Sequence, residues 1–361
     1  MLVAIRGGEQ AIENAERLLI EQRRGDPAIS ELSVEQIGEQ LSLAVDRTMN
    51  EGALYDRHAA SLALKQAQGD AAEAAFLLRT FRATLPRAGY SEPLHTASMQ
   101  IERRITPIVK EAPGGQYLGA TYDYIHRLLD EKPTGPDKSP ISTDNESDPI
   151  IAPHLADRLA RDGIAEKLPS ANSGADIFDI TRDPVMYPAN REVRLQSLSR
   201  ADEGFLTGLA NSTLQGYGEN FPLVTELRVG DVAVDFTIPE LGFAVTIGRV
   251  TLSECEILNK KLDVQSDEPR FTRGYGLSLG RSERRAMAMA VNDRALKGRD
   301  LGEAVQCPIE DEQFVLSNAD GVEAAGLLQS LKLPHYVSFQ AELKRLRDIQ
   351  AKHLLRGENS Q

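Results

Sequence analysis

The sequence predicts an α+β fold made of an N-terminal helical domain, a proline-rich linker and a C-terminal domain of antiparallel strands and helices. Three observations support this prediction. Apolar residues in the first third recur at spacings of three and four, prolines among polar residues fill 131–153, and strand-like segments cluster in 223–250 instead of alternating with helices. The predicted boundaries are 1–130 for the mainly helical domain, 131–153 for the flexible linker and 154–361 for the α+β domain.

Length and composition exclude several classes of protein. The 361 residues suit two domains, and the hydrophobic fraction of 41% can build their cores. The net charge of −13 is opposite to the basic footprint of nucleic-acid binding, and no run of about eighteen apolar residues predicts a membrane span. We therefore expect a cytoplasmic protein that binds neither nucleic acid nor membrane. Its two cysteines are too few for the four thiolates that hold an iron–sulfur cluster, so we expect no such cluster in this chain.

Helix signals fill the N-terminal domain. Ser33 followed by Gln36 fits a capping box, in which each side chain binds a free backbone amide of the first turn. Gly69 and Asp70 suit a tight connection between two alanine-rich segments. The predicted helices are 33–48, 56–68 and 71–85. They should pack as a small helical bundle.

The segment between this bundle and the linker is less regular. Imperfect alternation predicts a strand over 99–109, with a helix as the alternative. Pro113, followed by two glycines, predicts a turn. Thr121 can then cap a helix that runs to Leu129.

The C-terminal domain begins with helices and then changes to strands. Segments rich in β-branched residues are joined by Gly230-Asp231 and Pro239-Glu240, so they predict an antiparallel meander. The predicted strands are 223–228, 232–238 and 243–250, and the predicted helices are 154–161, 191–213, 282–296 and 339–355.

Glycines and arginines combine with the start of a helix in segment 271–288. Free backbone amides at a helix N-terminus and nearby guanidinium groups suit a phosphate. The segment lacks the spacing of a P-loop or of a dinucleotide-binding loop, and the alternative is a β-turn and helix cap with solvated arginines, which spacing alone favours. The candidate phosphate ligands are Arg273, Gly274, Gly276, Arg281 and Ser282.

Two acidic groups are candidates for acid–base catalysis. Asp123 lies between two tyrosines and near His126, and Asp202 is followed by Glu203 near a helix start. The alternative for both groups is structural, because acids are favoured in the first turn of a helix and a single histidine is often a core group. His335 lies just before the last predicted helix, and a lone histidine does not make a metal site.

Several long strings occur in order along the chain. They are Glu31-Leu-Ser-Val, Leu43-Ala-Val-Asp-Arg47, Pro113-Gly-Gly-Gln116, Thr121-Tyr-Asp-Tyr, His126-Arg-Leu-Leu-Asp130, Phe271-Thr-Arg-Gly-Tyr-Gly276, Ala286-Met-Ala-Met-Ala290 and Leu331-Lys-Leu-Pro-His-Tyr336. Together they resemble the PhnI family, whose members are subunits of bacterial carbon–phosphorus lyase. The resemblance spans nearly the whole chain and fades in the predicted linker.

The resemblance implies a place in a phosphonate-degrading core complex with PhnG, PhnH and PhnJ, served by PhnK and PhnL. It implies that PhnI, with PhnG, PhnH and PhnL, replaces the adenine of MgATP by a phosphonate, and that PhnI alone is a purine nucleosidase. Asp123, Asp202 and Glu203 are then candidate acids, and the segment from Arg273 to Arg285 is a candidate triphosphate clamp. The alternative function is a non-catalytic scaffold that positions partner subunits.

The resemblance also concerns zinc. Similar PhnI proteins usually place a second histidine five residues before the one that matches His335, and this pair is implicated in binding zinc facing PhnJ. Ser330 stands at that position here, and a hydroxyl is a poor substitute for imidazole. We therefore expect His335 to act as a hydrogen-bonding group. The alternative is zinc at the partner interface, with a replacement ligand from this chain, the substrate or a partner.

Overall fold

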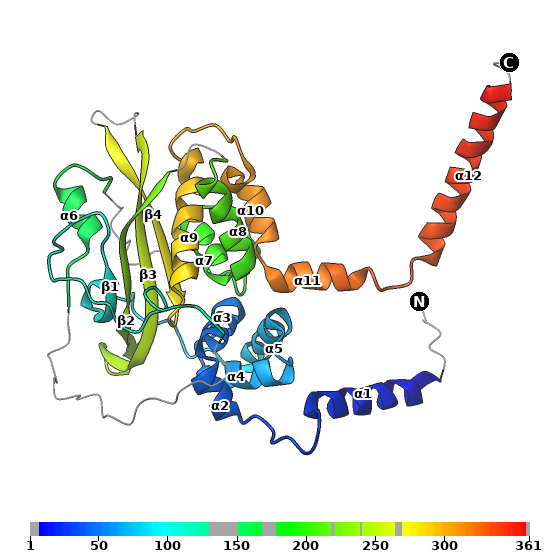
Figure 1. Cartoon of the computed structure of the whole chain (residues 1–361), viewed down its shortest axis with the longest axis horizontal. Coiled ribbons are helices and arrows are strands. Elements are labelled where there is room, and N and C mark those ends of the chain that lie inside the picture. The colour runs from blue at the N-terminus through cyan, green and yellow to red at the C-terminus, as the bar shows by residue number, and fades with distance from the viewer. Residues whose placement is uncertain are drawn as a thin grey trace. The chain divides into compact units, whose positions relative to one another are not determined.

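The computed structural model describes residues 7–129, 151–167, 178–217, 221–238, 240–263 and 269–358 (Figure 1). The chain divides into two compact units, Leu32–Gly321 and a smaller one formed by Met1–Glu31 with Val322–Gln361. Most of the predicted linker 131–153 lies outside the described residues, and the three domain boundaries stay predictions.

An antiparallel sheet forms the centre of the larger unit. In the described residues its order is β1-β2-β3-β4, and the predicted α+β fold is confirmed. The strands are β1 (Gln100–Ile105), β2 (Pro222–Ile238), β3 (Phe243–Asp263) and β4 (Arg270–Leu279). A strand, and not the alternative helix, therefore lies in the predicted segment 99–109, but it ends at Ile105, before the predicted end at residue 109.

The predicted helical bundle is confirmed. Ser33 Oγ accepts from the Gln36 amide at 3.1 Å, and Gln36 Oε1 accepts from the Ser33 amide at 2.9 Å, so the capping box is present. The predicted helix 33–48 is interrupted at Leu41, and Val45, Met49 and other apolar residues fill the bundle core. The helices are α2 (Val34–Gln40), α3 (Ser42–Gly52), α4 (Arg57–Gln66) and α5 (Ala71–Thr84).

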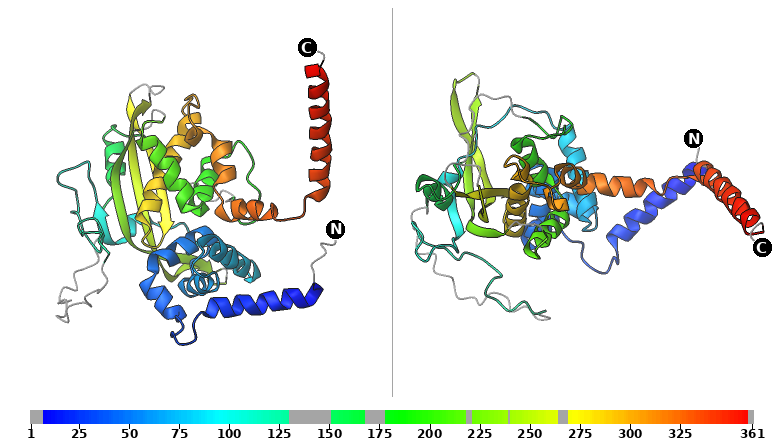
Figure 2. Two further views of the ribbon diagram at one scale, coloured as in Figure 1. Left: turned by 45° about the vertical axis from the view of Figure 1, so that its right-hand side comes forward. Right: turned by 90° about the horizontal axis from the view of Figure 1, so that it is seen from above.

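Helices cover both faces of the sheet (Figure 2). The apolar face packs against α9 (Glu283–Leu296), and α7 (Arg191–Arg200), α8 (Glu203–Leu214) and α10 (Glu312–Asn318) complete the core on that side. On the opposite face lies α6 (Leu155–Arg161), as Figure 1 shows. The predicted helix 191–213 is present but divided into α7 and α8. Asp202 begins the second helix, because its Oδ1 accepts a hydrogen bond from the Phe205 amide at 2.7 Å.

Glycine residues let α9 lie close to β4. A Cβ atom on Gly276 would come within 2.0 Å of the Ala286 carbonyl oxygen, and one on Gly274 within 2.2 Å of the Ala290 carbonyl oxygen. Only glycine fits such an approach of two backbones. These two glycines of the predicted phosphate segment therefore have a packing role within a strand.

Two local predictions were wrong. The segment from Thr121 to Leu129 is not a helix, because Thr121 Oγ1 accepts from the Asp123 amide at 3.1 Å and stabilises a turn instead. Gly230 does not end a strand, since β2 passes through it and continues beside β1. A Cβ atom on Gly230 would lie 2.0 Å from the Gln100 carbonyl oxygen, so this glycine also marks a close approach of backbones.

The other predicted turns lie where expected. The chain turns at the two glycines after Pro113, both with positive φ. It turns again at Glu240 to Gly242, where two amides donate to the Ile238 carbonyl oxygen at 3.0 Å, while Pro239 lies outside the described residues. β3 then runs well beyond its predicted end at residue 250.

The smaller unit contributes helices from both ends of the chain. They are α1 (Gly8–Arg24), α11 (Gly321–Ser330, whose first residue ends the larger unit) and α12 (Tyr336–Glu358). The predicted last helix is confirmed and begins three residues earlier than expected. Short 3₁₀ segments of the larger unit are Thr96–Ser98, Lys297–Arg299 and Pro308–Glu310. Among the helices described, none combines the length and apolar character that a membrane crossing needs.

Candidate active site

One face of the sheet carries a buried layer of charged side chains, here called the charged layer. Its members occupy alternate positions of their strands, which places them on the same face. Strand register brings Arg104 opposite Arg228, and Glu226 opposite Glu256. The charged layer consists of the buried residues Arg104, Glu226, Arg228, Glu254, Glu256 and Arg273, together with the partly buried, uncharged Tyr275.

Two ion pairs of this layer are fully buried. Arg104 Nε lies 2.6 Å from Glu226 Oε1, and Arg273 Nη2 lies 2.5 Å from Glu256 Oε1. Burial raises the pKa of Glu256, although the neighbouring Arg273 guanidinium acts in the opposite direction. Removal of water penalises each buried charge, and the opposite charge of its partner compensates for this penalty. Loss of either partner would therefore leave an uncompensated charge in the interior.

Other polar atoms of the layer have no hydrogen-bond partner among the described residues. They are Nε and Nη2 of Arg228 and Oε2 of Glu254 and of Glu256. Tyr275 donates its hydroxyl to Glu254 Oε1 at 2.8 Å, and burial together with Glu254 raises the pKa of Tyr275 well above its usual value. Buried polar groups are normally paired, so the layer has unused capacity for water or a polar ligand.

His154, the residue that precedes α6, contacts the charged layer. Its ring nitrogens lie 3.0 and 3.1 Å from Arg228 Nη1, and its Nδ1 lies 3.8 Å from a carboxylate oxygen of both Glu226 and Glu254. The next residue is fixed as well, because the Leu155 amide donates to Glu226 Oε2 at 3.0 Å. The start of α6 is therefore held on the sheet by the charged layer.

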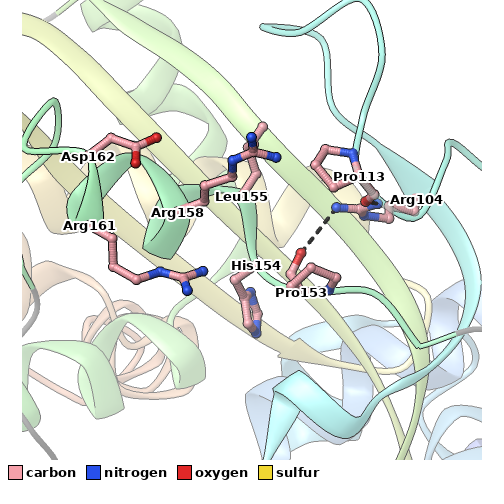
Figure 3. Close-up of a pocket in the computed structure, with 8 residues that line it drawn as sticks. All are labelled: Arg104, Pro113, Pro153, His154, Leu155, Arg158, Arg161 and Asp162. Carbon is pink, nitrogen blue, oxygen red and sulfur yellow. Dashed lines mark hydrogen bonds between the residues drawn. The ribbon is translucent and has the colours of Figure 1, made fainter.

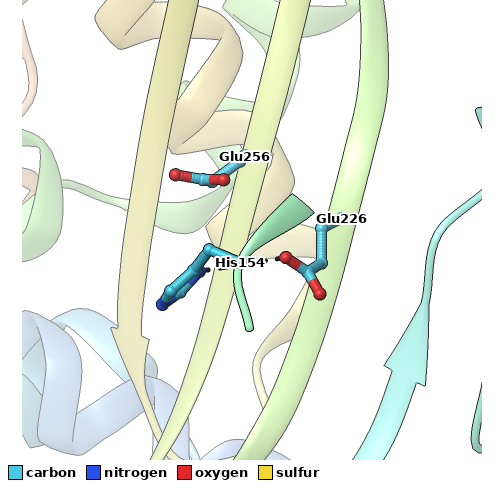
Figure 4. A group of neighbouring side chains, drawn as sticks. All are labelled: His154, Glu226 and Glu256. Atoms are coloured by element: carbon cyan, nitrogen blue, oxygen red, sulfur yellow. Dashed lines mark ion pairs between the residues drawn. The ribbon is translucent and has the colours of Figure 1, made fainter. Parts of the chain in front are cut away.

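His154, Glu226 and Glu256 have the donor types of a metal site (Figure 4). One ligand atom from each lies within 4.8 Å of the others. Both carboxylates already pair with arginines, however, and Arg228 approaches the imidazole. A divalent cation at this place would face three guanidinium groups, so the arrangement suits a hydrogen-bonded network better than a metal ion.

A pocket of about 460 Å³ opens between α6 and the end of β1 (Figure 3). Its lining residues are Arg104, Pro113, Pro153, His154, Leu155, Arg158, Arg161 and Asp162. Arg158 and Arg161 lie three positions apart on α6 and are exposed. The pocket therefore combines three guanidinium groups and an imidazole directly beside the charged layer.

A comparison with protein families matches nearly the whole chain. The model of the family described as "Bacterial phosphonate metabolism protein (PhnI)" matches residues 1–353. The chain belongs to the PhnI family. The resemblance predicted from the sequence strings is thus confirmed.

Curated relatives of this PhnI-family chain carry specific names. "Alpha-D-ribose 1-methylphosphonate 5-triphosphate synthase subunit PhnI" of Escherichia coli (strain K12) is 52% identical, with 97% of this chain and 98% of the relative covered. The protein of the same name from Rhizobium meliloti (strain 1021) is 48% identical, with coverages of 98% and 96%. "Putative C-P lyase subunit protein HtxH" of Stutzerimonas stutzeri is 40% identical, with coverages of 97% and 96%.

The predicted phosphate ligands of the PhnI-family chain fall into two groups. Arg273 lies in the charged layer, is 2% exposed, and contacts Glu256 and, at 3.2 Å, Asp157. Arg281 lies on the surface, 2.7 Å from Glu102, and Ser282 precedes α9 without capping it through its side chain. Arg273 and its neighbouring glycines are therefore separated along β4 from Arg281 and Ser282, and the assignment of all five to a phosphate stays a prediction.

The predicted acid Asp123 lies near the start of α9. Arg103 joins the two, because its guanidinium pairs with Asp123 and also with Glu283 in the first turn of α9. Asp46 accepts from the Arg281 amide at 2.9 Å at the same place. Arg103 thus links Asp123 to the first turn of α9, where the carboxylates and arginines are already paired.

Asp202 and Glu203 lie at the start of α8. Asp202 Oδ2 accepts from Arg47 at 2.7 Å while its Oδ1 caps α8, and the Glu203 amide donates to Glu51 Oε1 at 3.1 Å. Glu203 also lies 3.9 Å from Arg284. Both acids have structural contacts, and their catalytic roles stay predictions.

His335 lies between α11 and α12 in the smaller unit and is exposed. Ser330 donates its hydroxyl to the Leu327 carbonyl oxygen at 2.6 Å. Across the described ranges, the group of three potential metal ligands does not include His335. The described residues of this chain therefore do not form a zinc site around His335 by themselves, and its assignment as a ligand stays a prediction.

Neither the pocket residues nor most of the charged layer stand out in the sequence as functional residues. A signal for the layer was present in three strands, as Glu226-x-Arg228, Glu254-x-Glu256 and Arg273-x-Tyr275. Charges at alternate strand positions indicate either a solvated face or a buried network. Long-range pairing decides between them, and it is not visible in the sequence.

Proposed function

We propose that the chain is the PhnI subunit of an alpha-D-ribose 1-methylphosphonate 5-triphosphate synthase. In this role it replaces the adenine of MgATP by a phosphonate, and alone it acts as a purine nucleosidase that releases adenine and ribose 5-triphosphate. The observation that carries the proposal is the 52% identity, over 350 residues, to the relative of that name. Use of MgATP would place the protein in the cytoplasm.

The proposed reaction sets requirements for the site. The bond from C1′ of the ribose to the purine breaks with its electron pair on the purine, which takes a proton, and a phosphonate or water oxygen bonds to C1′. Because the transition state resembles an oxocarbenium ion, the site needs an acid, a nearby anionic group and a clamp on the triphosphate. Asp123, Asp202 and Glu203 remain the predicted acids.

The proposed partners are PhnG, PhnH and PhnL for the synthase reaction, and PhnJ and PhnK in the wider complex. Relatives named as subunits support an assembly of this kind. Helices of the smaller unit expose apolar side chains that could pack against partners. Examples are Ile20, Leu327, Leu328 and Phe339, each at least 60% exposed.

The same exposed helices favour a second candidate function, a scaffold without chemistry of its own. The predicted acids also fit it, since each already pairs with an arginine or caps a helix. A scaffold would be needed for assembly but would leave MgATP intact. The two functions therefore differ in a measurable product.

The test is to incubate the full chain with MgATP, alone and assembled with its proposed partners and methylphosphonate. We expect adenine and ribose 5-triphosphate in equal amounts from the chain alone, and a ribose 1-methylphosphonate 5-triphosphate signal in phosphorus NMR from the assembly. An assembly that forms normally and yields neither product would support the scaffold.

Acid substitutions make this test specific. If one predicted acid protonates the purine, Asp123→Asn, Asp202→Asn or Glu203→Gln should lower the rate of adenine release by about 100-fold to 10,000-fold without preventing assembly. Asp183→Asn is a matched control, because Asp183 is an exposed acid of the same unit outside these contacts. Unchanged rates in all three variants would remove these acids from the mechanism.

A further inference from the structure

We propose that the pocket between α6 and β1 binds the polyphosphate of the nucleotide substrate, with the guanidinium groups of Arg158 and Arg161 as its ligands. The assignment rests on the proposed function, because it takes MgATP as the substrate. The lining contains three arginines and one histidine against a single acid, Asp162. In a chain of net charge −13, this local excess of positive charge favours an anion.

Arg104 forms a wall of the pocket, and four of its five N–H donors already bind other parts of the chain. Its Nε pairs with Glu226. Its Nη1 donates to the carbonyl oxygens of Pro113 at 2.6 Å and Gly115 at 2.8 Å, and its Nη2 to that of Pro153 at 3.2 Å. Arg104 therefore fixes the shape of the pocket and adds charge to it.

Arg158 and Arg161 differ from Arg104 because their guanidinium groups are available. In the part of the chain that the structure describes, neither makes an ion pair, and Arg161 uses only Nε, which lies 3.4 Å from the Asp157 carbonyl oxygen. Positions three apart on a helix are neighbours on its surface. Figure 3 shows both side chains extending from α6 toward the region of Arg104 and His154. Two adjacent guanidinium groups can bind successive phosphates with charge-assisted hydrogen bonds.

A second, independent observation points to a ligand at this place. His154 lines the pocket and also contacts Nη1 of Arg228, which is 1% exposed and whose Nε and Nη2 have no hydrogen-bond partner among the described residues. Such buried donors normally have a partner, so a polar ligand or its water beside His154 would satisfy them. The pocket volume of about 460 Å³ lies within the range of small-molecule sites, roughly 300 to 1,000 Å³.

The experiment uses the full chain assembled with its partners and the double variant Arg158→Gln/Arg161→Gln. Calorimetry gives the Kd of inorganic tripolyphosphate, and adenine release gives the KM for MgATP. We expect both constants to rise about 10-fold to 100-fold, since two charge-assisted hydrogen bonds are lost. The unfolding midpoint should stay unchanged because both side chains are exposed.

Two variants control for charge and for folding. Arg249→Gln removes an exposed arginine of β3 that does not line the pocket, and it should leave both constants unchanged. Arg158→Lys/Arg161→Lys keeps the charge but loses the planar pair of donors, so its Kd should lie between the unmodified protein and the glutamine variant.

The outcomes separate this proposal from the proposed function and from a phosphonate site. An unchanged tripolyphosphate Kd in the glutamine variant overturns the pocket assignment, even if the unmodified complex releases adenine. A raised KM for methylphosphonate with an unchanged tripolyphosphate Kd also overturns it, since the pocket would then hold the phosphonate. If the unmodified complex binds tripolyphosphate through these arginines but releases no adenine, the polyphosphate site is supported and the proposed reaction fails.

Discussion

The start of α9 and the outer face of α6 both gather arginines, but with opposite consequences. At α9, Arg281 pairs with Glu102 and Arg284 approaches Glu203, while the buried Arg285 donates to backbone carbonyl oxygens. On α6, Arg158 and Arg161 face a pocket without ion pairs in the described part of the chain. An arginine is available to a ligand when no carboxylate pairs with it, and the number of arginines along the sequence does not show whether such pairing occurs.

The largest expected effect comes from removing a buried arginine of the charged layer. Arg273→Ala should lower the free energy of unfolding by about 3 to 5 kcal/mol, because it leaves Glu256 buried without its partner. Urea unfolding measures the change, and Arg161→Ala, on an exposed arginine, should shift the same quantity by less than about 0.5 kcal/mol. If Arg273→Ala instead keeps its stability and loses affinity for MgATP, Arg273 is a phosphate ligand as the sequence predicted.

The next effect concerns the contact between β4 and α9. Gly276→Ala should destabilise the fold by at least about 1 to 3 kcal/mol, because its Cβ would collide with the backbone oxygen of Ala286, 2.0 Å away. Gly248→Ala is the control, since a Cβ there meets nothing within 4 Å. Chemical unfolding gives the denaturant midpoint of each variant. Equal midpoints would show that the packing of β4 against α9 does not constrain position 276.

A smaller effect is expected at the paired surface arginine near α9. Arg281 and Glu102 lie 2.7 Å apart with side chains 52% and 42% exposed, so a double-mutant cycle should give a coupling energy below about 1 kcal/mol. Coupling above about 2 kcal/mol would mean that the pair is shielded from solvent. If Arg281 binds triphosphate, as the sequence predicted, Arg281→Ala raises the KM for MgATP with stability nearly unchanged.

The smallest effect is a pH dependence at the same helix start. Burial raises the pKa of Asp46, against the opposing influence of the Arg281 amide and of Arg57. The Asp46 carboxyl group therefore keeps its proton to higher pH in the folded protein than in the unfolded chain. Its contribution to the free energy of unfolding is lost as pH rises through 3.8 toward the raised pKa. The free energy of unfolding of Asp46→Asn, relative to the unmodified protein, should therefore increase from pH 4 to pH 7. A difference that is flat or decreases across this range would contradict the shift.

Local signals predicted much of the fold. The capping box at Ser33 and the alanine-rich helices were read correctly because their stabilising contacts lie within a few residues. Gly230 was misread as a turn because its cause is the approach of β1, about 130 residues away in the sequence. Glycine next to a strand indicates a turn or a close contact equally well when its neighbours in space are unknown.

The candidate site was harder to predict for the same reason. Arg273 stood among glycines that suggested a phosphate loop, but Glu256 from the adjacent strand occupies its guanidinium. Arg158 carried no motif at all, and its place in a pocket depends on β1 and on the turn after Pro113. Which arginines are neutralised is decided by pairing across the sheet, and the sequence does not show that pairing in advance.

Arg104 joins three parts of the chain through one guanidinium group. The turn near Pro113, the segment ending at Pro153 and the strand partner Glu226 all meet on it. None of these parts can build the pocket alone, so the pocket exists only after the sheet and its connections have formed. Ligand binding in the pocket is then linked to global folding. Tripolyphosphate at 100 times its Kd would raise the free energy of unfolding by about 2.7 kcal/mol, and the fraction of chains that bind it would measure the fraction that is folded.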